Sequence, residues 1–234
     1  MNAIRRRFWA ARVHRTLALV VGIQILLWTA SGLVMTLFPI EEVRGEHLVR
    51  PAEPVVLDRP LVMPDFAGVP VEAIALRRIG DRPVLIVDHP GGRQLHDPYT
   101  GAELARPDAA RIRALAARAY RGSGSITRVR LIAARPPVEY RGELPVWQVS
   151  FDDAARLNLY LDATTGDIVA RRTRLWRVYD FLWMLHIMDY RAREDFHHPL
   201  ISIAAGLALS TVVAGGVLAV VRTRTGVRRR RIAD

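Results

Sequence analysis

The sequence predicts a membrane α+β protein in which two transmembrane helices flank an α+β domain of two antiparallel-sheet units. Two uncharged apolar runs, residues 16–38 and 199–221, border a polar segment in which apolar and polar residues alternate. At about 1.5 Å of rise per helical residue, each run is longer than the roughly 30 Å hydrocarbon core of a bilayer. We therefore expect each run to form one membrane span.

The basic residues predict the orientation of these spans. Residues 1–15 carry five arginines and no acid, and residues 222–234 carry six arginines and one acid, so both tails are strongly basic. The positive-inside tendency then predicts that both termini are cytoplasmic and that the central domain lies outside. Because the arginines adjoin the spans, we expect the lipid bilayer as their partner, and no nucleic acid.

A secretory signal peptide is the alternative interpretation of the first run. The apolar region of a signal is typically about 7–15 residues, whereas this run continues through Trp28, Met35 and Phe38. Its length favours a retained helix. The absence of cysteine excludes disulfides, thiolate metal sites, iron–sulfur clusters and cysteine nucleophiles.

The segment between the runs predicts a linker followed by two similar units. Residues 39–66 are expected to form an extended linker, because four spaced prolines lie between residues 51 and 64. Residues 71–104 and 127–169 then repeat one order of strand-like stretches, and each ends in Asp-x-x-Thr-Gly or a close variant, at 97–101 and 162–166. Alternation with period two predicts strands with one buried face, and the closing motif predicts a turn.

A short helix is expected between the two copies. Pro107 and Asp108 precede apolar residues at the spacing i, i+3, i+4 and i+7, with Asp108 as the expected cap. In the first copy only residues 65–69 occupy the corresponding place, so we expect no helix there.

A helix followed by a three-stranded meander ending in this turn resembles the PepSY domain, and residues 160–169 carry the closest likeness. Residues 67–106 are interpreted as a degraded PepSY-like unit and 107–174 as a fuller one. An unrelated α+β domain with two similar hairpins is the alternative. The first span resembles the opening of PepSY-associated transmembrane proteins through His14-Arg15, Gly22 and Ser31-Gly32.

Larger members of that family are similar to inner-membrane ferric-siderophore reductases, in which histidines bind b-type haem. The resemblance implies haem b as cofactor, with His14, His186, His197 and His198 as its candidate binding residues. The chain departs from the family by having half the usual number of spans, and its His186-Ile187-Met188 lacks the glycine of the family's His-x-Gly. We expect no catalytic side chain and no separate metal site.

Depth in the membrane limits how these histidines combine. His14 is expected at the cytoplasmic edge, whereas the other three lie in residues 175–198, an expected interfacial amphipathic helix and loop on the outer side. They therefore cannot share one haem within a single chain. A six-coordinate site needs either two of the outer histidines or His14 paired with another subunit.

Simpler roles are open for each candidate. The small residues that follow His14 along one helical face suit a porphyrin, but close helix packing also explains all of them. His186 can belong to an aromatic belt, and His197 and His198 can form the polar cap of the second span, with Pro199 in its first turn. An ion held by Glu194, Asp195 and the two adjacent histidines is a further alternative.

Two functions fit this description. The first is an inner-membrane, haem b-bearing or accessory component of electron transfer and ferric chelate reduction in iron uptake. No dinucleotide fingerprint is present, so an oxidoreductase of this kind needs a quinol or a partner as donor. The second is a non-catalytic anchored module whose periplasmic domain binds or restrains a peptidase or a neighbouring membrane complex, with residues 157–161 as an exposed strand. A homodimer or a membrane redox or transport partner is compatible with both.

Overall fold

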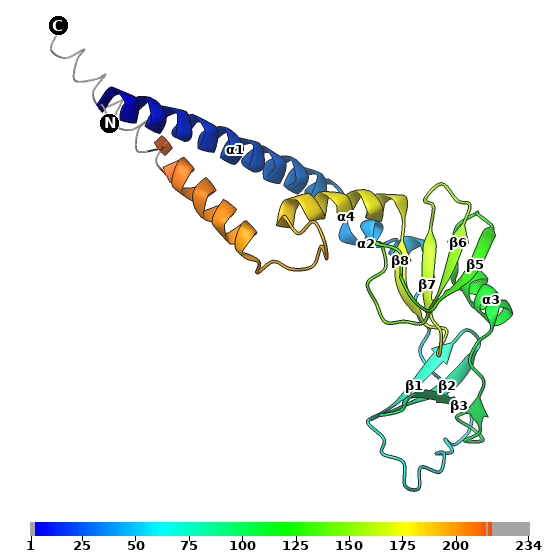
Figure 1. The fold of residues 1–234 in the computed structure, drawn as a ribbon. Coiled ribbons are helices and arrows are strands. Elements are labelled where there is room, and N and C mark those ends of the chain that lie inside the picture. Colours follow the sequence, from blue (N-terminus) through cyan, green and yellow to red (C-terminus); the bar gives the residue numbers. More distant parts are fainter. Residues whose placement is uncertain (1–2, 214, 217–234) are drawn as a thin grey trace, which may run out of the picture. The chain divides into compact units, whose positions relative to one another are not determined.

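The computed structural model describes residues 3–213, 215 and 216, without the side chains of residues 3–14 and 17. The chain divides into two compact units (Figure 1). One is helical and comprises the segments before Pro39 and after Val178, and the other is an α+β unit, Pro39–Val178. The α+β class expected from the sequence is therefore confirmed.

Within residues 3–213, three helices lie wholly or partly in the helical unit. Helix α1 covers Ala3–Leu37, so it extends the expected first span toward the N-terminus. Its part Ala18–Leu37 has a mean hydropathy of 2.0 and is, among the described residues, the one helix long and apolar enough to cross a membrane. Helix α4, Arg174–Ile187, ends in this unit, and a shorter apolar helix follows at Pro199–Val213. The rest of the expected second span lies mostly outside the described residues.

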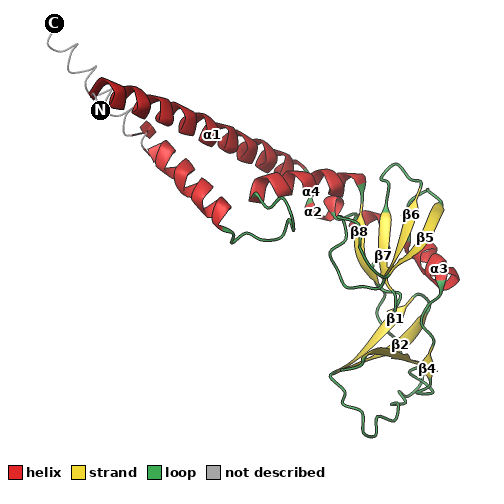
Figure 2. Ribbon diagram, in the orientation of Figure 1, coloured by secondary structure: helices red, strands yellow, loops and turns green. Residues whose placement is uncertain are grey.

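The α+β unit opens with two short helical turns, α2 (Ile40–Val43) and η1 (Glu46–Leu48). An extended segment follows, as the prolines predict, and two four-stranded antiparallel sheets come next (Figure 2). The first sheet has the order β1-β2-β3-β4 and the second the order β5-β6-β7-β8. Their bounds are β1 Ala73–Ile79, β2 Arg82–His89, β3 Gly92–His96, β4 Glu103–Leu104, β5 Ile126–Ile132, β6 Val146–Phe151, β7 Asn158–Asp162 and β8 Ile168–Arg172.

The closing turns of the two sheets have the same internal hydrogen bonds. Asp162 Oδ1 accepts from the amides of Thr164 and Thr165, at 2.8 and 2.7 Å, and Asp97 Oδ1 accepts likewise from the two residues that follow Pro98. The glycine that ends each turn has a positive φ, +79° at Gly166. Each turn leads into a fourth strand, so the sheets have one strand more than the expected three-stranded meander.

Helix α3, Ala109–Ala119, confirms the helix expected between the two copies. Asp108 caps it, since its Oδ1 accepts from the amide of Arg111 at 2.8 Å. Its apolar face buries Ile112 and Ala116 completely. No helix occurs at 65–69, where the sequence predicted none.

One apolar core joins both sheets to α3. The first sheet contributes the last residue of β1, two residues of β2 and one residue of β3. The second sheet contributes the inward faces of β6 and β7. The buried members are Val49, Ile79, Val84, Ile86, Leu95, Ile112, Leu115, Ala116, Tyr120, Val149, Phe151, Leu157, Leu159 and Leu161.

Two details of the second sheet differ from the expectation. The outer face of β6 and β7 is covered as well, because Tyr140 from the loop before β6 stacks on Tyr160 with ring centres 4.6 Å apart. Gln148 and Tyr160 are consequently buried, and the prediction of a single buried face was wrong there. The expectation of an exposed strand at residues 157–161 was also wrong, because β7 lies between β6 and β8.

Candidate functional site

His186 lies in the last turn of α4 and contacts α1. Its Nδ1 is 2.9 Å from the hydroxyl of Ser31, and its main-chain oxygen accepts from the indole N–H of Trp28 at 2.7 Å. A Cβ added to Gly32 would be 3.7 Å from Cε1 of the same imidazole. Gly32 therefore leaves room for the His186 ring itself. This contact accounts for part of the row of small residues on one face of the first apolar run.

The contacts of Ser31 favour one tautomer of His186. The Ser31 hydroxyl lies 2.7 Å from the main-chain oxygen of Leu27 and 3.2 Å from that of Trp28, and both of these oxygens are acceptors. With its proton directed to either of them, the hydroxyl oxygen accepts from His186, and Nδ1 is then the nitrogen that carries a proton. Nε2 is left with its lone pair, the arrangement in which a histidine acts as a metal ligand.

The loop after α4 is tied together by two acids. The carboxylate of Asp189 accepts four main-chain amides between residues 191 and 195, at 3.1 to 3.2 Å. Burial opposes ionisation of Asp189, but these four donors outweigh it and hold the pKa well below its ordinary value. Asp180, buried on α4, pairs with the guanidinium of Arg193, and the indole of Trp183 donates to the main-chain oxygen of Arg193 at 3.1 Å.

The two adjacent histidines take different positions in this loop. His198 Nε2 is 2.9 Å from the main-chain oxygen of Ile187, so the imidazole donates to the C-terminal end of α4. His197 is exposed, and its amide donates to Asp195. The described structure thus brings His186 and His198 to the same end of α4, while His197 faces solvent.

His14 lies in α1, but its side chain is outside the described residues. Among the described residues there is no group of three or more His, Asp or Glu side chains that could hold a metal ion. The alternative of an ion at residues 194–198 has no support from this arrangement.

Sequence reasoning missed three residues that build the site. Trp28 contacts the end of α4 from a segment 158 residues away, whereas Asp180 of α4 pairs with Arg193 in the loop that follows the helix. One signal was present: Trp28, Ser31 and Gly32 are spaced by three and four residues and so share a face of α1. Nothing local in the sequence paired Asp180 with Arg193.

The arrangement provides one oriented imidazole beside an apolar helix, with its Nε2 lone pair available and its other nitrogen held. A histidine held in this way can act as a metal ligand through Nε2. No family model, curated protein or solved structure matches the chain.

Proposed function

We propose that the chain is a two-span inner-membrane protein of PepSY type that acts as a haem b-bearing or accessory component of electron transfer to ferric chelates in iron uptake. The apolar helices Ala18–Leu37 and Pro199–Val213 support two spans, and the arginine-rich tails support cytoplasmic termini. The α+β unit is then periplasmic.

The observation that carries the haem proposal is the state of the His186 ring. Ser31 accepts from Nδ1, so Nε2 is available to an iron centre, and this second hydrogen bond is typical of metal-bound histidines. His186 would therefore be the residue that holds the haem iron, through Nε2. When bound, haem supplies one-electron exchange between ferric and ferrous iron.

The histidines that one chain brings together favour a haem site shared between two copies of the chain. Nε2 of His198 is already used by the main-chain oxygen of Ile187, and the exposed His197 is not brought to His186. A second histidine for the iron would come from a second copy of the chain, consistent with a homodimer.

A difference spectrum tests the proposal. The full chain, purified in detergent from haem-supplemented cells, should give b-type Soret and α bands when the oxidised spectrum is subtracted from the dithionite-reduced one. His186→Ala should remove them, and Ser31→Ala should weaken haem affinity by about tenfold or more, because the ring loses its partner. His47→Ala, in η1 of the other unit, is the matched control. Absence of these bands in the parent protein, or their survival in His186→Ala, would refute haem binding at His186.

Reporter fusions test the topology separately. Fusions after residue 120 should be active only with a periplasmic reporter, and fusions at the C-terminus only with a cytoplasmic one. A cytoplasmic reporter active at residue 120 would contradict the periplasmic location of the α+β unit.

The second candidate function is a non-catalytic anchored module that binds or restrains a peptidase or a neighbouring membrane complex. The observation in its favour is that β5 is an edge strand with exposed Thr127, Arg128 and Leu131, so an extended peptide can pair with it. A photo-crosslinking residue at Leu131 should then capture one peptidase or membrane protein in cells, whereas the same residue at Val138, which is more exposed, should not. Equal yields at the two positions would count against this candidate.

A further inference from the structure

The α+β unit contains a cleft of about 270 Å³ whose walls are rich in arginine. Its floor is apolar and includes the buried side chains of Ile79, Leu115 and Leu161. Its walls come from the extended segment after η1, the end of β1, the last turn of α3 and the turn between β7 and β8. All of these elements belong to the one compact unit.

Five arginines and two acids line this cleft, namely Arg50, Arg77, Arg78, Arg118, Arg171, Glu53 and Asp167. Glu53 pairs with Arg78 at 3.3 Å, and Asp167 pairs with Arg77 at 3.4 Å. Among the described residues no carboxylate lies within ion-pair distance of the other three guanidinium groups. Arg171 uses its Nε on the main-chain oxygen of Arg44, at 3.4 Å, which leaves its terminal nitrogens for another partner. The cleft therefore carries an excess of three positive charges.

Main-chain hydrogen bonds fix the backbone that bears two of these arginines. The amide of Arg50 donates to the main-chain oxygen of Ala119 at 2.8 Å, and the amide of Arg121 donates to that of Leu48 at 2.9 Å. This short antiparallel pairing places residue 50 beside the end of α3, where Arg118 lies. Both arginine side chains are exposed, so they can reach a ligand without breaking an internal ion pair.

We propose that this cleft binds a small anion with two or more carboxylates, such as a hydroxycarboxylate that chelates ferric iron. Arginine is suited to such a ligand because its planar guanidinium donates two parallel hydrogen bonds to one carboxylate. The apolar floor suits the carbon backbone of the ligand, and the cleft volume is close to that of small-ligand sites. The assignment of the ferric form rests on the proposed function, whereas binding of the free polycarboxylate does not.

Calorimetry on the full chain in detergent tests the proposal, with citrate, ferric citrate and pyrophosphate as probes. Citrate should bind saturably at low ionic strength and more weakly at high salt. The double variant Arg50→Gln/Arg118→Gln should bind at least about tenfold more weakly, since it removes the charged hydrogen bonds of two guanidinium groups. Pyrophosphate should bind more weakly than citrate, and ferric citrate should bind at least as tightly as citrate.

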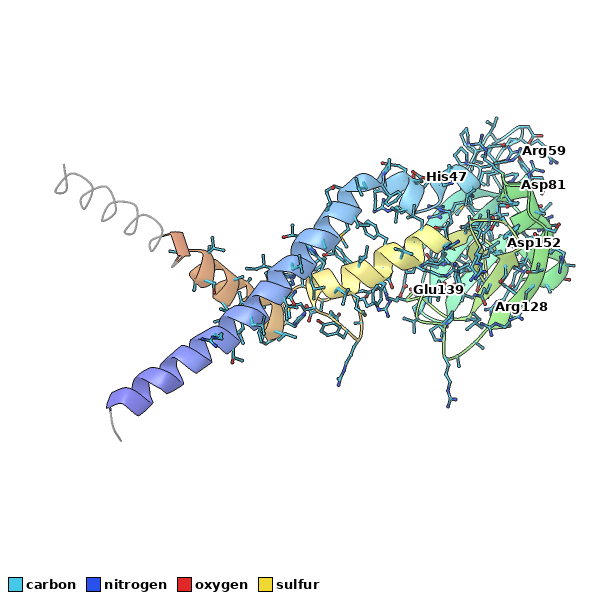
Figure 3. The ribbon with its side chains drawn as sticks, turned by 90° about the horizontal axis from the view of Figure 1, so that it is seen from above. His47, Arg59, Asp81, Arg128, Glu139 and Asp152 are labelled. Atoms are coloured by element: carbon cyan, nitrogen blue, oxygen red, sulfur yellow. The ribbon has the colours of Figure 1, made fainter. Side chains whose placement is uncertain are left out.

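A matched variant separates a specific site from a general charge effect. Arg128→Gln/Arg135→Gln removes two exposed arginines outside the cleft, with Arg128 labelled in Figure 3, and should leave citrate affinity unchanged. Equal weakening in both double variants, absence of saturable citrate binding, or equally tight pyrophosphate binding would overturn the proposal. The reduced-minus-oxidised haem spectrum should be unchanged in Arg50→Gln/Arg118→Gln. If the parent protein from haem-supplemented cells shows no b-type bands but binds citrate, the proposed haem site is refuted and the assignment of the cleft stands.

Discussion

At the scale of single residues, Glu139 lies in the loop between β5 and β6 and is held by three side-chain donors; Figure 3 labels it. Its carboxylate accepts from Tyr160 and Asn158 at 2.6 Å each and pairs with Arg177 of α4. Gln148 donates in turn to the hydroxyl of Tyr160 at 2.9 Å. Burial favours the protonated form of Glu139, but the three donors outweigh it and lower the pKa below the ordinary value. The same burial, together with the nearby carboxylate, raises the pKa of Tyr160 far above its ordinary value.

This network predicts a pH-dependent loss of stability in Glu139→Gln. Because the folded-state pKa is lowered, the stabilisation by Glu139 is fully present above the unfolded-state pKa and is lost as pH falls through the folded value. At pH 7 the variant should lose about 1–3 kcal/mol of unfolding free energy, since Arg177 and Tyr160 lose a charged acceptor. At about pH 4 and below the difference from the parent should shrink.

Urea unfolding of the full chain at the two pH values measures this effect. Glu103→Gln, an exposed acid on β4, is the control and should change stability little at either pH. A loss in Glu139→Gln that is the same at pH 7 and below pH 4 would show that packing and not charge is responsible.

At the scale of elements, Leu115 of α3 packs against two turns, the β1–β2 turn and the β7–β8 turn. A Cβ added to Gly80, in the β1–β2 turn, would be 2.7 Å from Leu115 Cδ2. A Cβ added to Gly166, in the β7–β8 turn, would be 2.7 Å from Leu115 Cδ1. Both glycines also have positive φ, at +68° and +79°. Each turn therefore requires glycine for its backbone and for its contact with α3.

Gly166→Ala should consequently destabilise the fold by about 2–4 kcal/mol. Roughly 1–2 kcal/mol comes from the left-handed backbone and the rest from crowding against Leu115. Gly68→Ala is the matched control, because Gly68 has φ +81° and nothing within 4 Å of the added Cβ. It should cost only the backbone part. Thermal or urea unfolding compares the two variants, and equal losses would show that the contact with Leu115 carries no energy.

The elements that the sequence predicted well are those whose causes are local. The Asp108 cap lies within one turn of α3 and the apolar spacing of this helix spans about two turns. The Asp162 turn is closed by amides of the turn itself. The covered outer face of the second sheet was missed because it depends on Tyr140, which belongs to an irregular loop without periodicity. Burial of Gln148 follows from the same loop. A polar residue at an alternating position of a strand does not indicate that a loop buries that face of the sheet.

In the candidate site too, the individual residues could be recognised from the sequence, but the contacts between distant residues could not. His186 and Ser31 were both recognised in the sequence, yet their contact joins residues 155 positions apart and could not be inferred from spacing. The expected separation of His14 from the outer histidines stays a prediction, because the His14 side chain lies outside the described residues.

At the scale of the whole molecule, the two sheets form one compact unit with α3, although the sequence presents them as successive copies. Leu115 contacts a turn of each sheet, and residues of both sheets line the same core. Neither sheet can then expose its inner face without opening the core of the other. Cooperative unfolding of the whole α+β unit follows from this shared burial.

Hydrogen exchange with Leu115→Ala tests that cooperativity. Removing the side chain should lower the opening free energy by about 2–4 kcal/mol, the usual cost of truncating a buried leucine. Because the core is shared, amides of β2 in the first sheet and β6 in the second should lose protection by the same amount. Val138→Ala, at a largely exposed position, should leave both unchanged. If Leu115→Ala accelerated exchange in β6 while β2 kept its protection, the two sheets would be separate folding units despite their common core.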